Sequence, residues 1–246
     1  MRLCVPSRRL LPGLLLCAAL LSGCDNPRPR EPQLNPRPQP ADALALPPAA
    51  RSTEAAVERP GPYAWDPDAR AFTFQGQPLQ SGRLWTFEGS TDGFVMAGGE
   101  VAPAETLGLR LAARAFDPAL RSPSGLALDG AQFNHVLVRV TRLAPAADWD
   151  GALHYVTAAH PEAAAFMAKP FQGERPKVNE TVILAYDMRS PTKGGDDWVS
   201  SLIESIRLDF DDAAGGEFLI HQIAITEPPR PPSPVSAPAP VLRPAT

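Results

Sequence analysis

The stretch FNHVLVRVTRL, residues 133–143, decides the fold class of this chain. Val136, Val138 and Val140 occupy alternate positions, and polar side chains such as Arg139 stand between them. A period of two is typical of a β-strand that turns one face toward a core, and β-branched residues favour strands. Residues 133–143 are therefore predicted to form a β-strand.

The same alternation recurs along the chain, between turns rich in Gly, Pro, Asp and Asn. The further predicted strands lie within residues 70–76, 82–89, 105–114, 151–157, 180–188, 204–210 and 217–226. Eight short strands with turn signals predict an all-β fold, an antiparallel β-sandwich. Two stretches have a helical pattern instead: residues 160–169, with Pro161 at a first helical position, and residues 196–205, with Asp197 as a cap.

Composition divides the chain into four parts. We expect a lipoprotein signal peptide in residues 1–23, a Pro-rich tether in 24–62, the β-sandwich in 63–227 and a disordered Pro-rich tail in 228–246. The predicted sandwich holds thirteen basic and twenty-two acidic residues, a net charge of −9. Such a domain is a poor partner for nucleic acid, so a neutral ligand or a basic partner is expected.

The N-terminal part combines three arginines, a short apolar run and the sequence Leu21-Ser22-Gly23-Cys24. The apolar run is too short to span a bilayer. The four residues resemble the lipobox of bacterial lipoproteins, which implies a lipid on Cys24 and cleavage after Gly23. We therefore expect a membrane-anchored protein of the bacterial cell envelope, on the periplasmic side. The choice between inner and outer membrane stays open, although Asp25 resembles an inner-membrane retention signal.

The order of segments in the predicted sandwich resembles that of galactose-binding-like jelly-roll domains, which include many carbohydrate-binding modules. The resemblance rests on LWTFEGSTDGF (84–94), on DWVSSLIESIRLDF (197–210) and on the final strand FLIHQIAI (218–225). The final strand has His221 where that family often has Asp, which is a departure. The resemblance implies a jelly roll and glycan binding, but fold alone does not establish function.

Glycan binding needs aromatic rings for the C–H faces of sugars, and charged or amide groups for the hydroxyls. The predicted ligand-binding residues are Trp149, Tyr155, His160 and Arg207. His154 and Tyr155 lie on opposite faces of one predicted strand, so only one of them can face a shared groove. A second candidate site is the long loop at residues 158–180.

The sequence shows no nucleophile elbow, phosphate-binding loop or dinucleotide fingerprint, so we expect no enzyme activity. No cofactor is expected. A structural calcium ion at Asp209, Asp211 and Asp212 is an alternative to a solvated turn. A zinc site at His154 and His160 is less favoured than ordinary polar contacts.

The prediction is an envelope lipoprotein whose β-sandwich recognises a glycan without cleaving it. Two alternatives stay open. One is a scaffold or assembly lipoprotein that binds other proteins. The other is a carbohydrate-active hydrolase, since acidic residues are plentiful but no pair of them stands out.

Overall fold

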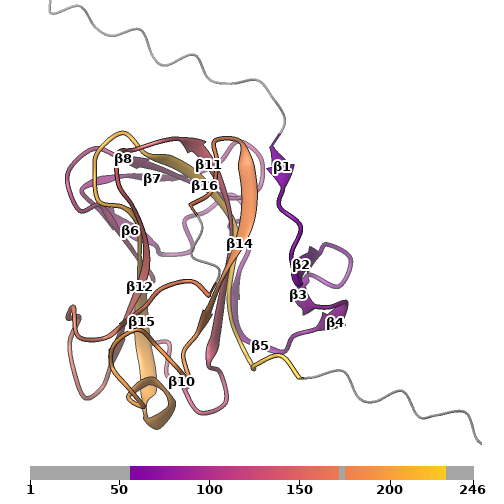
Figure 1. Cartoon of the computed structure of the whole chain (residues 1–246), viewed down its shortest axis with the longest axis vertical. Coiled ribbons are helices and arrows are strands. Elements are labelled where there is room, and N and C mark those ends of the chain that lie inside the picture. Colours follow the sequence, from indigo (N-terminus) through magenta and orange to yellow (C-terminus); the bar gives the residue numbers. More distant parts are fainter. Residues whose placement is uncertain (1–55, 172–174, 231–246) are drawn as a thin grey trace, which may run out of the picture. The chain divides into compact units, whose positions relative to one another are not determined.

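The computed structural model describes residues 56–171 and 175–230. Its strands form two large, mainly antiparallel sheets that pack face to face, and a small third sheet (Figure 1). All of these residues belong to one compact unit, Pro48–Thr246. The predicted all-β fold, an antiparallel β-sandwich, is therefore confirmed.

The larger sheet has seven strands in the order β1-β14-β11-β16-β8-β7, with β5 also paired to β16. Their bounds are β1 Val57–Glu58, β5 Ser81–Trp85, β7 Gly99–Pro103, β8 Leu109–Ala113, β11 His135–Ala144, β14 Glu180–Asp187 and β16 Glu217–Thr226. All of its pairings are antiparallel except that of β1 with β14.

The smaller sheet has six strands in the order β13-β12-β15-β9-β6, with β10 also paired to β15. Their bounds are β6 Val95–Ala97, β9 Ala119–Arg121, β10 Leu128–Asp129, β12 Trp149–Thr157, β13 Met167–Ala168 and β15 Leu202–Asp211. The outer face of this sheet carries the candidate site described below.

The main core lies between the two large sheets. Alternate residues of β11, such as Val138, meet alternate residues of β12 and β15, such as Leu153 and Leu208, and all are buried. A register shift in the pairing of β11 with β16 lets Ile220 and Ile223 both face this core. Two sheets that each bury one face explain the period of two in the sequence.

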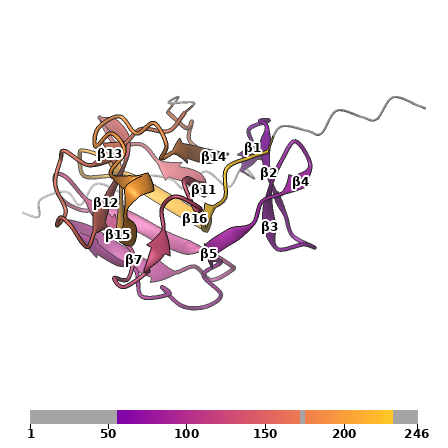
Figure 2. The same ribbon diagram turned by 90° about the horizontal axis from the view of Figure 1, so that it is seen from below.

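The third sheet, β2 Tyr63–Asp66, β3 Ala71–Phe74 and β4 Gln77–Pro78, lies against the outer face of the larger sheet (Figure 2). Phe72 and Leu79 pack there on Leu137 and Ala185 in a second, smaller core. The outer face of the larger sheet is therefore partly covered, whereas the site on the smaller sheet lies on the opposite side of the sandwich.

All eight predicted strands are confirmed, but both predicted helices are wrong. Residues 160–169 form turns and the short strand β13, because His160 is fixed by Asp197 and Glu162 by two arginines. In residues 196–205 only Trp198–Ser200 forms a 3₁₀ helix before β15 begins. Asp197 makes no side-chain cap hydrogen bond there, because its carboxylate accepts from His160 instead.

The described fold begins before the predicted boundary at Tyr63. Val57 and Glu58 pair with β14, and the Arg59 guanidinium donates two hydrogen bonds to the carboxylate of Glu180. The predicted signal peptide, most of the tether and most of the tail lie outside the described residues. Among the residues described, no helix is long and apolar enough to cross a membrane.

Candidate functional site

A cleft of about 470 Å³ lies on the outer face of the smaller sheet. Its volume falls within the range of about 300–1,000 Å³ that is usual for small-molecule sites. Charged side chains dominate its lining. The lining residues are Asp117, Asp150, His154, Glu162, Ala163, Ala164, Met167, Lys193, Arg207, Asp209 and Asp212.

The floor of the cleft comes from two paired strands. His154 on β12 is the register partner of Arg207 on β15, and Asp209 follows two residues after Arg207. Residues two apart point to the same face of a strand, so these side chains share the outer face while Tyr155 and Leu208 turn into the core. The wall comes from the 158–166 loop, which carries Glu162.

Arg207 is the centre of an ion-pair network. Its guanidinium lies 2.7 Å from Glu162, 2.6 Å from the Asp209 carboxylate and 3.1 Å from Asp117. Burial lowers the pKa of Arg207, but hydrogen bonds to Asp209 and Glu162 outweigh this effect and raise it. The planar guanidinium is thus held in one orientation by carboxylates from β15 and from two loops.

Glu162 is held by a second arginine as well. Arg121 donates two hydrogen bonds to its carboxylate, of 2.7 and 2.8 Å. The hydrogen bonds from Arg121, followed by those from Arg207, lower the pKa of Glu162 from 4.5 to about 2. Glu162 therefore stays ionised and fixes the loop to the sheet.

Asp209 contacts a histidine as well as Arg207. The Nε2 atom of His154 lies 3.4 Å from the Asp209 carboxylate, whose side chain is only 5 % exposed. Burial raises the pKa of Asp209, opposed by its hydrogen bonds with Arg207. The imidazole thus has an orienting partner on the same face of the sheet.

Carboxylates crowd the other end of the cleft. Burial raises the pKa of Asp212, and so do the negative charges of Asp150, Asp117 and Asp148, while Lys169 opposes them. Lys169 contacts Asp150 through its ammonium group. Backbone hydrogen bonds join Asp212 to Asp117 and to Asp148, so these acidic residues are held side by side and this end of the cleft has a surplus of negative charge.

Of the four predicted ligand-binding residues, only Arg207 lines the cleft. Trp149 is partly buried and stacks on Phe210, with ring centroids 6.1 Å apart. Tyr155 is fully buried in the core, which keeps its side chain away from any surface ligand, and of the two residues on opposite faces of the strand it is His154 that lines the cleft. The ring centroids of His160 and Tyr155 lie 5.7 Å apart. Neither residue is part of the cleft lining that contains Arg207.

His160 has a structural environment. Its Nε2 lies 2.7 Å from Asp197, its Nδ1 lies 2.9 Å from the carbonyl oxygen of Pro161, and its ring stacks on Phe166 at 3.4 Å. These contacts fix the start of the loop that carries Glu162. His160 therefore supports the cleft from behind rather than lining it.

Sequence reasoning missed most of the cleft. Asp117 and Glu162 come from separate loops, and no spacing in the sequence brings them to β15. The one available signal was the alternation along β12 and β15, which puts His154, Arg207 and Asp209 on one face. The predicted loop site, residues 158–180, does contribute Glu162 and Met167.

The three aspartates considered for calcium do not converge. Asp209 pairs with Arg207, whereas Asp211 turns inward to the buried Arg142, 3.0 Å away. Asp212 lies at the crowded end of the cleft. Within residues 56–171 and 175–230, no group of three or more acidic, His or Cys side chains is arranged to hold a metal ion.

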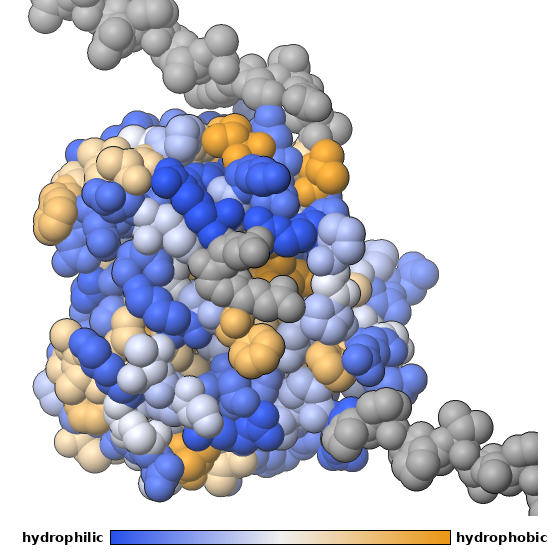
Figure 3. Space-filling model, viewed as in Figure 1, coloured by the Kyte–Doolittle hydropathy of each residue, from blue (hydrophilic) through white to orange (hydrophobic). Residues whose placement is uncertain are grey.

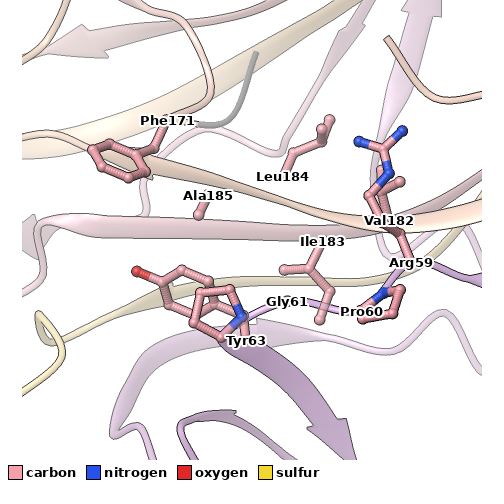
Figure 4. A pocket seen from close by; sticks show the side chains of 10 residues that line it. Arg59, Pro60, Gly61, Tyr63, Phe171, Val182, Ile183, Leu184 and Ala185 are labelled. Carbon is pink, nitrogen blue, oxygen red and sulfur yellow. The ribbon is translucent and has the colours of Figure 1, made fainter. Parts of the chain in front are cut away.

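Two other hollows in the described part of the chain are too small for a sugar. One of about 30 Å³ lies beside β14, where Phe171 and Tyr63 stand on either side of Ala185 (Figure 4). Another, of about 10 Å³, lies between the sheets beside Asp211. Both have room for little more than water molecules, since one water needs roughly 10–15 Å³.

Sequence comparisons give no relative for this chain: no protein-family model matches it, and no curated protein matches it. Cys24, the predicted lipidation site, lies outside the described residues.

Comparison of structures finds similar β-sandwiches at low identity. The CBM22-1 xylan-binding domain of Paenibacillus barcinonensis Xyn10C is 14% identical, with a TM-score of 0.43 over 61% of this chain and 97% of that one. A family 29 carbohydrate-binding module from Piromyces equi is 14% identical, with a TM-score of 0.38 over 55% and 80%. A carbohydrate esterase from the Shiga toxin-encoding bacteriophage phi24B is 12% identical, with a TM-score of 0.39 over 61% and 99%.

Proposed function

We propose that the cleft on the smaller sheet binds a glycan without cleaving it. The observation that carries the proposal is a cleft of about 470 Å³ in which Arg207, Glu162 and Asp209 are held in fixed orientations by one another. Charged groups that are already oriented bind hydroxyls with little loss of side-chain entropy. A sugar presents several hydroxyls close together, each both a donor and an acceptor.

The cleft also offers apolar surface for the C–H groups of a sugar. Met167, Ala163 and Ala164 contribute side-chain carbon beside the charged groups. Among the described lining residues none is Phe, Tyr or Trp, so recognition here depends mainly on hydrogen bonds rather than on ring stacking. Phe116 precedes Asp117 in the chain and is 81% exposed, which makes it the candidate aromatic at the rim.

The geometry favours binding over hydrolysis. A glycosidase needs one carboxyl group that is free to protonate the leaving oxygen and a second that is free to attack or to activate water. In the cleft, Glu162 is bound to Arg121 and Arg207, and Asp209 is bound to Arg207. Each of these carboxylates is ion-paired with a guanidinium group, which suits an orienting role, and the lone pairs that the arginines do not use stay available to sugar hydroxyls.

The surface also argues against a broad protein-docking face on the side seen in Figure 3. That side is covered mainly by hydrophilic residues, and the hydrophobic residues not hidden by grey atoms form small separate groups. Protein interfaces of stable complexes usually need larger contiguous apolar areas.

A glycan array tests the proposal. The fragment Pro48–Thr246, with and without calcium, is expected to bind one class of glycan and to release no reducing sugar from it. The double variant Lys193→Ala, Asp212→Asn changes two cleft residues outside the Arg207 network and should lower affinity about tenfold or more. Asp68→Asn, in the exposed turn between β2 and β3, is the matched control and should bind as the wild type does.

A blank array with a fragment shown to be folded would overturn the proposal, as would equal binding by the cleft variant. Capture of a basic protein in place of any glycan would favour the scaffold alternative.

We further propose that a lipid on Cys24 anchors the protein in a bacterial envelope membrane, facing the periplasm. The lipobox-like sequence supports this, and three acyl chains would anchor firmly at about 0.8 kcal/mol for each buried methylene. Expressed as the full chain, the wild type is expected in the membrane fraction with incorporated labelled palmitate. Cys24→Ser should lose the label and leave that fraction, and an unchanged distribution would refute the anchor.

A further inference from the structure

We infer that the glycan bound in the cleft carries free amino groups, so that it is a polymer containing cationic 2-amino-2-deoxy sugars. The inference rests on the proposed function and names the class of its ligand. It follows from how the charges of the cleft are distributed among fixed partners.

The cleft is acidic in sum. Asp117, Asp150, Glu162, Asp209 and Asp212 line it together with only two basic side chains, Lys193 and Arg207, which leaves a net charge of −3. Two cations just outside the lining compensate in part: Arg121 pairs with Glu162, and Lys169 pairs with Asp150. Asp148, also close by, adds a further negative charge.

The surplus of negative charge is concentrated at the end of the cleft that contains Asp212. Glu162 and Asp209 are matched by Arg207 and Arg121, with N–O distances of 2.6–2.7 Å. Asp212 instead lies beside Asp117 and Asp148, to which backbone hydrogen bonds of 3.0 and 2.9 Å join it. Asp117 is paired with Arg207 and Asp150 with Lys169, whereas Asp148 and Asp212 form no ion pair in the described part of the chain. A ligand that brings a positive charge to this end relieves the repulsion among the carboxylates.

The two ends thus favour different parts of one ligand. At the Arg207 end, an oriented guanidinium and imidazole suit sugar hydroxyls and ring oxygens. At the Asp212 end, carboxylate acceptors suit an ammonium group, and a charge-assisted hydrogen bond is about twice as strong as a neutral one. An amino sugar carries both groups on one ring. A uronic acid would place a carboxylate beside Asp212, which like-charge repulsion disfavours.

The test uses β-1,4-linked oligosaccharides of equal length that differ at C2: glucosamine, N-acetylglucosamine and glucose oligomers, with a galacturonic acid oligomer as the anionic probe. Calorimetry with the Pro48–Thr246 fragment should show the glucosamine oligomer binding about tenfold more tightly than the acetylated one, as expected for one charge-assisted hydrogen bond. The preference should shrink as salt is added, because exposed charges are screened.

Asp212→Asn should remove most of the preference for the glucosamine oligomer and leave weak binding of the neutral oligomers. Asp68→Asn should show the same preference as the wild type. Equal binding of the three C2 forms, or tighter binding of the uronic acid, would overturn the inference but leave glycan binding intact. Failure of every oligosaccharide, together with a blank array, would instead overturn the proposed function. Equally tight binding of a sugar-free polyamine would show that charge alone is recognised, and would overturn both.

Discussion

Replacing Glu162 by Gln should destabilise the sandwich in a pH-dependent way. The two arginines lower the pKa of Glu162 from 4.5 to about 2, and the full difference corresponds to about 3 kcal/mol of stability at neutral pH. The side chain is 28% exposed, so solvent screening reduces this figure, and we expect Glu162→Gln to cost about 1–2 kcal/mol.

The sign of the pH dependence follows from the direction of the shift. The pKa of Glu162 is lower in the folded state than in the unfolded state, so its contribution is complete above pH 4.5 and is lost as the pH falls toward 2. Urea unfolding of the Pro48–Thr246 fragment at a series of pH values measures it. The difference in unfolding free energy between wild type and Glu162→Gln should narrow as the pH falls below about 4.5, because Glu162 then takes up a proton in the unfolded chain while it is still ionised in the folded one.

Asp68→Asn removes one exposed charge elsewhere and should show no comparable gap at any pH. If Glu162→Gln unfolds at the same urea concentration as the wild type throughout, the two arginines do not stabilise the loop. If the difference in unfolding free energy between wild type and Glu162→Gln stays the same at the lowest pH measured, the effect comes from packing and not from charge.

Three further changes test the fold that positions the cleft. Trp198→Ala should lower the free energy of unfolding, measured in urea, by about 3–5 kcal/mol, because the ring is fully buried and also donates a hydrogen bond to the Phe133 carbonyl. A loss below about 1 kcal/mol would contradict its place in the core. Arg142→Ala should lower the free energy of unfolding by about 3–5 kcal/mol, because it leaves the carboxylate of Asp211 buried without a partner. Replacing both residues by apolar ones should lower it less. Equal losses for the two variants would show that the ion pair does not cause the effect. Gly130→Ala should lower the thermal midpoint, because a Cβ atom there would collide with the backbone carbonyl of Trp198; an unchanged midpoint would mean that the turn relaxes freely.

The strands were predictable because each large sheet buries one face against the other. Val138 and Leu153 lie in the core, as their alternation requires, and the same rule puts His154 on the outer face. The two helices were mispredicted because runs such as AAAF in residues 163–166 have helical propensity that tertiary contacts override. The ion pairs of Glu162 and the burial of Trp198 decide the conformation there.

The site was only partly predictable. Arg207 was found because it stands in a strand with a clear pattern, whereas Asp117 and Glu162 reach it from loops whose course depends on the whole fold. Aromatic residues were weighted toward ligand binding, yet Tyr155 and Trp149 pack with other rings, since aromatic side chains contribute most to a core of this size. Side-chain chemistry alone does not separate a binding ring from a packing ring.

The most direct test of the central claim is a map of the bound ligand on the protein. The isotope-labelled Pro48–Thr246 fragment is titrated with the glycan selected on the array, and changes in its amide resonances are assigned. The changes should cluster on β12, on β15 and in the loop that carries Glu162, with the largest around Arg207. Changes confined to the third sheet or to the outer face of the larger sheet would contradict that claim.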